Sequence, residues 1–167
     1  MADIEFTDNS VQVKTALDDA VIAWLYEAGG ALEAQTKKNT SNRNYGNRDV
    51  KNSWKHTVNE SKKTTKVGSN LEASYWEEFG TGEHALYHNG RKGWWVYVEG
   101  NETPSAKQKM YTEREAKAVA ASMRRKGLDA HATNGNEPNR PLYTAFTTKK
   151  ASIIIRFQKI LGERFNG

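Results

Sequence analysis

The chain has 167 residues, of which 37% are hydrophobic, with a mean hydropathy of −0.85 and a formal net charge of +5. This length favours one domain spanning residues 1–167, and no apolar run approaches the roughly 20 residues that cross a bilayer, so we expect no membrane partner. Cysteine is absent, which excludes disulfides and thiolate chemistry, and the first residues lack the pattern of a signal peptide; we therefore expect folding in a reducing cytoplasm.

Residues 10–36 are predicted to form an amphipathic helix. Apolar residues recur every three or four positions from Val13 to Leu32, which makes one continuous stripe. Ile22, Leu25 and Tyr26 widen the apolar surface beyond that stripe, so we assign them to a possible oligomer interface. The alternative is a helix buried inside a monomer, and the sequence leaves both open.

Residues 37–52 are polar and basic, show no hydrophobic period, and are predicted to form a mobile loop. The positions assigned to possible contact with DNA or an acidic partner are Lys37, Lys38, Arg43, Arg48 and Lys51. Between residues 37 and 70 there are nine Lys or Arg and two acids, a net charge of +7 that exceeds the +5 of the whole chain. Such a segment attracts polyanions by salt-sensitive electrostatics, although a solvated loop is the simpler alternative. The nearby aromatic residues Tyr45 and Trp54 are the type that stacks on single-stranded bases.

The middle of the chain is predicted to be rich in strands. Alternation over residues 54–58 and the β-prone residues 64–67 predict a hairpin, and a third strand is expected from Ala73 to Phe79. Gly80-Thr81-Gly82 then requires a tight turn with positive φ. A second hairpin is expected from residues 85–88 and 94–98 across Asn89-Gly90. Its Trp94 and Trp95 complete the possible oligomer interface.

The last third of the chain is predicted to contain two helices. Thr112 and Glu115 form a capping box that starts a helix over residues 112–126, and a short strand follows at 128–133. The final helix runs from Pro141 to about Leu161, with an apolar face marked by Leu142, Phe146, Ile153, Phe157 and Ile160. We expect an α+β fold: a small, mostly antiparallel sheet with long N-terminal and C-terminal helices packed on one face, plus an inserted hairpin and helix.

No pattern typical of catalysis is present. The chain contains no P-loop, dinucleotide-binding or nucleophile-elbow motif. His84 and His88 lie four apart in a segment that we interpret as a strand, where their side chains would be roughly 13 Å apart, too far for one ion. We therefore predict no catalytic residue, no metal site and no cofactor.

An ordered set of motifs resembles a known family. The segment Tyr75-Trp76-Glu77-Glu78-Phe79-Gly80-Thr81-Gly82 is followed much later by Asn139-Arg140-Pro141-Leu142 at the start of the last helix. This order is similar to that of the small tail-component, or tail-completion, proteins of long non-contractile-tailed bacteriophages. The positions that match the family pattern are Tyr75, Glu78, Phe79, Gly80, Thr81, Gly82, Pro141 and Leu142. Gly46 and Ser53 match a weaker upstream element. The stretch of about 83–137, which many relatives replace with a short loop, departs from the pattern.

The resemblance implies a structural virion protein that is not an enzyme and that acts in tail completion and head–tail joining. It implies a ring-forming subunit, with a hexamer expected, at the neck end of the tail. Its partners would be copies of itself and neighbouring neck, tail-terminator or tail-tube proteins, with possible non-specific contact with packaged DNA. The location would be the virion tail or neck, and the host cytoplasm during assembly. The alternatives are a basic nucleic-acid-binding module and, less favoured, a metal-dependent enzyme.

Overall fold

The computed structural model describes residues 8–41, 48–99 and 109–165. Where the length predicts one domain, the chain forms two compact units: unit 1 comprises residues 1–70 and 141–167, and unit 2 comprises residues 71–140. Unit 2 is thus inserted in the sequence between the two halves of unit 1. The family-variable stretch at about 83–137 falls entirely within unit 2.

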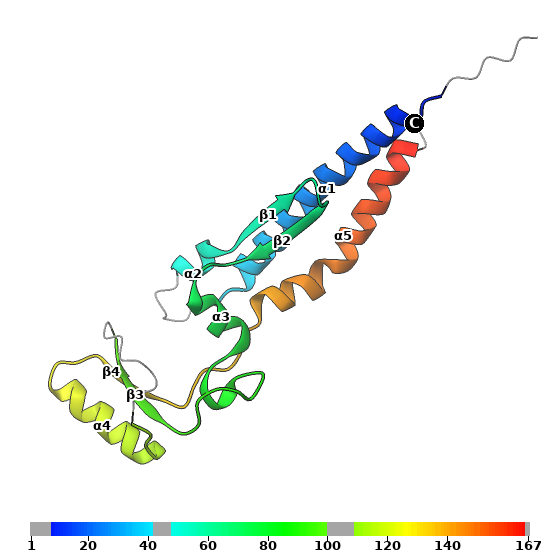
Figure 1. The fold of residues 1–167 in the computed structure, drawn as a ribbon. Helices are drawn as coiled ribbons and strands as arrows, with labels where there is room; N and C mark the ends of the chain where they lie inside the picture. The colour runs from blue at the N-terminus through cyan, green and yellow to red at the C-terminus, as the bar shows by residue number, and fades with distance from the viewer. Residues whose placement is uncertain (1–7, 42–47, 100–108, 166–167) are drawn as a thin grey trace, which may run out of the picture. The chain divides into compact units, whose positions relative to one another are not determined.

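Unit 1 is built around its first helix. Helix α1 (Ser10–Asn39) runs antiparallel to α5 (Pro141–Phe165), and the hairpin of β1 (Lys55–Asn59) and β2 (Thr64–Gly68) packs along α1, preceded by the short helix α2 (Arg48–Ser53) (Figure 1). The hairpin is antiparallel, with Thr57 opposite Lys66, as the alternating sequence predicts. The predicted last helix is confirmed and continues past Gly162.

One side of α1 binds α5. The Trp24 ring packs on Phe157 with ring centroids 4.5 Å apart, and its Nε1 donates a hydrogen bond to the carbonyl oxygen of Ile153. Glu27 pairs with the Nε of Arg156 through both carboxylate oxygens, at 3.0 and 3.1 Å. These contacts come from positions 24 and 27, one helical turn apart, so they fix a single face of α1 toward α5.

Another side of α1 binds the hairpin. Glu33 accepts hydrogen bonds from the backbone N–H of His56, and Asp18 pairs with Lys63 at the hairpin turn. Gly29 is the point of closest approach, because a Cβ added there would lie 2.6 Å from Oγ1 of Thr65. The glycine therefore lets the strand backbone and side chains approach α1 more closely than any larger residue would.

Unit 2 contains the second sheet. Strand β3 (Trp95–Val98) pairs antiparallel with β4 (Ala130–Thr133), and α4 (Glu113–Arg125) packs against both strands (Figure 1). The contact is made by small residues, since Ala116, Ala120 and Ala130 are buried. The predicted capping box at the start of α4 is confirmed: Thr112 Oγ1 accepts from the backbone N–H of Glu115, and the Glu115 carboxylate accepts from that of Thr112.

The α+β class is confirmed, but two predicted strands are wrong. Residues 73–79 lie in helix α3 (Glu72–Phe79). The rings of Tyr75 and Phe79 lie 4.7 Å apart, tilted by 48°, because the two residues are four apart on one helical face. Gly80 ends α3 with φ of 72°, and its N–H donates to the carbonyl oxygen of Trp76. A glycine that follows Glu-Glu-Phe is a helix stop as readily as a strand end.

The second predicted hairpin is also wrong. Residues 85–88 form turns after the short 3₁₀ helix η1 (Gly82–His84), and β3 pairs with β4, some 35 residues away, rather than with its neighbour. Gly90 instead packs closely against the backbone of Gly82, where any Cβ would overlap a carbonyl oxygen. The expected single sheet is therefore two separate two-stranded sheets, and α5 packs on α1 rather than on a sheet.

Candidate functional site

The Gly80-Thr81-Gly82 turn is held by a distant segment of unit 2. Gly80 and Gly82 have φ of 72° and 60°, as predicted. The backbone N–H of Thr81 donates to the carbonyl oxygen of Asn136 at 2.9 Å, and the N–H of Asn136 donates to Oγ1 of Thr81 at 3.0 Å. The N–H of Glu83 donates to the carbonyl oxygen of Asn134 at 2.9 Å. Both glycines face this backbone so closely that a Cβ on either would overlap it.

The same contact extends to the end of unit 2. The carbonyl oxygen of Glu77 accepts from the backbone N–H groups of Asn139 and Arg140, and the side-chain amide of Asn139 donates to Oε1 of Glu77 at 2.9 Å. The structure thus joins the two motifs that carry the family resemblance. We define residues 77–83 with residues 134–140 as the backbone clamp. It fixes where the chain leaves unit 2 just before Pro141, a structural role that accounts for the glycines without any ligand.

The remaining motif residues occupy varied surroundings. Glu78 is buried in α3, and Pro141 is fully buried at the start of α5, where Leu142 is half-buried. Phe79 lies between Tyr75 and Tyr87, with ring centroids 4.7 and 5.5 Å away. Tyr75 and Tyr87 are exposed, so Phe79 anchors a small aromatic cluster near the surface of unit 2.

The prediction of a loop over residues 37–52 is wrong at both ends, where the chain is helical. Lys37 and Lys38 lie in the last turn of α1, and Arg48 and Lys51 lie in α2; Arg43 and Gly46 lie outside the described residues. Lys37 pairs with Glu33 at 2.5 Å, so it serves the contact between α1 and the hairpin. The Lys37 ammonium and, next, His56 lower the pKa of Glu33 to about 2. Lys38 and Lys51 are exposed.

The described part of the structure does not support the predicted stacking of aromatic residues on nucleic-acid bases. Trp54 is 3% exposed, so its ring cannot stack on a base, and Tyr45 lies outside the described residues. The hairpin still presents positive charge to solvent, because Lys55, Lys62 and Lys66 are all exposed. Ser53, of the weaker upstream element, bonds Oγ to Oγ with Ser69 at 2.6 Å and so closes the base of this hairpin.

The residues assigned to an oligomer interface mostly have partners inside their own unit. Leu25 is buried, and the hydroxyl of Tyr26 donates to Glu60 in the hairpin turn at 3.0 Å. Ile22 is half-buried, one turn from Asp18 on the side of α1 that faces the hairpin. Trp94 and Trp95 are half-buried, with Lys117 over the first ring and Arg91 over the second. Of these five, Tyr26 alone is exposed.

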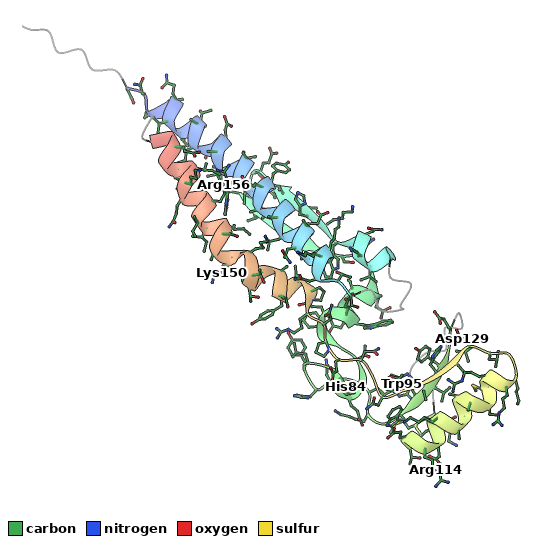
Figure 2. The ribbon with its side chains drawn as sticks, turned by 180° about the vertical axis from the view of Figure 1, so that it is seen from behind. His84, Trp95, Arg114, Asp129, Lys150 and Arg156 are labelled. Atoms are coloured by element: carbon green, nitrogen blue, oxygen red, sulfur yellow. The ribbon has the colours of Figure 1, made fainter. Side chains whose placement is uncertain are left out.

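Helix α5 has exposed apolar side chains that the sequence did not predict. Four side chains on it are 46–64% exposed, and we call them the outer stripe: Tyr143, Phe146, Ile154 and Ile155. Phe146 was expected on the inner face. At about 100° per residue, Tyr143 and Ile154 lie roughly a quarter turn from Ile153, whose carbonyl accepts from Trp24. Phe146 lies within about 20° of Ile153, and Ile155 lies about 200° from it. Lys150 lies among them on the outer side of α5 (Figure 2).

One set of three side chains of the types that can ligate a metal comes together in the described part of the chain. Ligand atoms of Glu99, Asp129 and His131 all lie within 4.8 Å of one another. The sequence reading missed this set because Glu99 is thirty residues from its partners. His84 ends η1 and His88 lies in the bend that follows, so the predicted strand from which their separation was derived is absent from residues 84–88.

Within the described residues, no helix is long and apolar enough to cross a membrane. Comparison of the chain with protein-family models, with curated proteins and with solved structures gave no match.

Proposed function

We propose that this chain is a structural subunit of a long-tailed bacteriophage, acting in tail completion and head–tail joining as part of a ring at the neck end of the tail. The family part of the proposal rests on the ordered motifs from Tyr75 to Gly82 and at Pro141-Leu142. The assembly part rests on one observation, the outer stripe of α5. Large apolar side chains that are exposed together on one helix are candidates for an interface, and those of the outer stripe are spread over about half of the circumference of α5.

The size of the outer stripe sets how strongly copies would associate. Full burial of a Phe or Ile side chain is worth about 1.5–3 kcal/mol, and these four are already about half buried, so the stripe offers about 4 kcal/mol. Loss of translational and rotational freedom on association costs at least about 4 kcal/mol. The stripe alone therefore gives weak association in dilute solution. A ring closed on the end of a tail, where the partners are already held in place, is the favoured state.

The test uses matched serine substitutions. Phe146→Ser and Ile154→Ser, singly and together, are placed in the phage that encodes this chain, beside Leu128→Ser as the control. Ile154 and Leu128 are 46% and 44% exposed, so the control removes a similarly exposed apolar side chain, and it belongs to unit 2 rather than to α5. We expect the stripe variants to melt like the wild-type chain and to leave unjoined heads and tails, whereas Leu128→Ser forms particles normally. Normal incorporation of the double stripe variant would contradict the proposed interface.

A nucleic-acid-binding module is the second candidate, supported by the exposed lysines of the hairpin. The two functions differ in their dependence on salt. Binding of duplex DNA through lysines alone weakens steeply with added salt and does not depend on the outer stripe. Tight, stripe-independent DNA binding at physiological salt would favour this alternative over the ring.

A further inference from the structure

The outward face of the β3–β4 sheet is polar at one end. Tyr97 is opposite His131 in the ladder, and the backbone N–H of Glu99 donates to the carbonyl oxygen of Asp129 at 2.8 Å, just beyond the last pair. Since alternate residues of a strand share a face, Tyr97, Glu99, Asp129 and His131 lie on the same side of the ribbon. Their neighbours Val98 and Ala130 lie on the other side, toward α4, where Ala130 is fully buried.

The three polar side chains converge. His131 Nε2 lies 2.8 Å from Oδ1 of Asp129 and 3.9 Å from Oε2 of Glu99. The Tyr97 ring stacks on the His131 ring at 5.2 Å and so restricts the direction of its nitrogen atoms. Asp129 lies where the chain enters β4 (Figure 2). Two carboxylates are therefore held next to one imidazole.

The environment of His131 Nε2 indicates more than an ordinary ion pair. The atom is buried, although the ring as a whole is 41% exposed, and within the described residues it makes no hydrogen bond. The Asp129 oxygen is close enough to accept a hydrogen bond from Nε2. The bond is absent because the N–H group does not point at that oxygen. Two ligands of one metal ion show this relation. At metal–ligand distances near 2.1 Å their donor atoms lie about 3–3.5 Å apart, and each points at the ion instead of at the other. The separations of 2.8 and 3.9 Å from His131 Nε2 lie just below and just above that range.

We propose that Glu99, Asp129 and His131 bind one divalent transition-metal cation. Imidazole nitrogen with two carboxylate oxygens suits zinc and similar first-row ions better than magnesium or calcium, which prefer oxygen alone. A sheet of two four-residue strands is only marginally stable by itself. The ion joins Glu99, just after β3, to Asp129, just before β4, and to His131 within β4, so it clamps this end of the ladder. Three protein ligands leave coordination positions for water.

The experiment is a zinc titration of the full chain, without a histidine tag and stripped of metal by a chelator, followed by isothermal calorimetry. We expect one zinc ion per chain, and a melting temperature that rises with zinc. Asp129→Asn and His131→Gln should each weaken zinc binding at least tenfold, as loss of a ligand costs no less than loss of its supporting contacts. His84→Gln and His88→Gln, also in unit 2, are the matched controls and should bind zinc as the wild type does.

A third ligand variant keeps the test decisive if the other two fold poorly. The Glu99 side chain is 62% exposed, so Glu99→Gln should leave the metal-free melting temperature unchanged and still lower the zinc affinity. The proposal is overturned if the wild-type chain shows no saturable zinc binding, if Glu99→Gln binds zinc with wild-type affinity, or if His84→Gln abolishes binding.

Discussion

Two adjacent glycines of α1 provide a sharp test of how the hairpin packs. A Cβ on Gly29 would lie 2.6 Å from Oγ1 of Thr65 and 2.8 Å from Cδ2 of His56. Replacing a helical glycine with alanine gains about 1 kcal/mol of helix propensity. Forcing a methyl group into a filled contact costs about 1–3 kcal/mol, and here it also displaces the His56 ring from Glu33. We therefore expect Gly29→Ala to lower the free energy of unfolding by about 1 kcal/mol.

Gly30→Ala is the matched control. The nearest atom to its Cβ would be Cε1 of His56 at 3.9 Å, an ordinary van der Waals distance. The helix gains the same propensity, so Gly30→Ala should stabilise the chain by about 0.5–1 kcal/mol. The two substitutions are chemically identical and neighbouring, and their difference of about 2 kcal/mol isolates the packing of the hairpin on α1.

The assay is hydrogen–deuterium exchange of peptides from β1 and β2, together with urea unfolding followed by circular dichroism. Exchange reports on unit 1 directly, because two compact units need not unfold in one step. Gly29→Ala should speed exchange in both strands, and Gly30→Ala should slow it or leave it unchanged. Equal stabilisation by the two substitutions would refute the close approach of the hairpin to α1.

Three further perturbations test other contacts. Gly82→Val should lower the melting temperature or the yield of folded protein, with a loss of roughly 1–3 kcal/mol in the free energy of unfolding. The valine would have to adopt a positive φ, and its Cβ would overlap the backbone of Asn134. A wild-type melting curve would show that the backbone clamp is not needed. Glu33→Gln should cost about 1 kcal/mol at pH 7 after solvent screening. Since the folded pKa of Glu33 is about 2 against 4.5, wild-type stability is complete above pH 4.5 and is lost toward pH 2, where wild type and Glu33→Gln should unfold at the same urea concentration. The double variant Lys55→Gln/Lys66→Gln should melt within about 1 °C of the wild type, because exposed charges add little stability. It should reduce any retention of the protein on DNA at low salt. Unchanged retention would exclude the hairpin as the DNA contact.

Local signals in the sequence predict much of unit 1 and one helix of unit 2. The period of α1, the alternation of β1 and β2, and the Thr112–Glu115 capping box each depend on residues within one or two turns, so the predictions agree with the structure. The positive φ of Gly80 and Gly82 is predicted for the same reason, since glycine adopts it at the least steric cost.

The predictions are wrong where the local structure depends on contacts between residues far apart in the sequence. Residues 73–79 are aromatic and β-prone, yet the Tyr75–Phe79 contact and the Gly80 helix end favour a helix. The pairing of β3 with β4 has no local signal, because the intervening chain returns through α4 before β4 begins. The clamp between residues 77–83 and 134–140 and the Glu99–Asp129–His131 cluster depend on that same return. Neither can be found from spacing along the chain.

The side of a helix that remains exposed is equally hard to predict. Ile22, Leu25 and Tyr26 seemed free for a neighbour, but the hairpin packs on their side of α1. Phe146 was predicted to be internal and lies within about 20° of Ile153 around α5, yet it is 49% exposed, two turns before the part of α5 that packs on Trp24. Periodicity tells how wide an apolar surface is, and only the packed structure tells which part of it already has a partner.

The sharpest test of the proposed function is image reconstruction of intact particles that contain this chain, which the proposal takes to be those of a tailed bacteriophage. We predict several copies of the chain in a closed ring where the tail meets the head, six of them by the family resemblance, with the outer stripe of each α5 covered by its neighbour. A single copy at the neck, a ring elsewhere in the particle, or a ring with Phe146 and Ile154 facing solvent would contradict it.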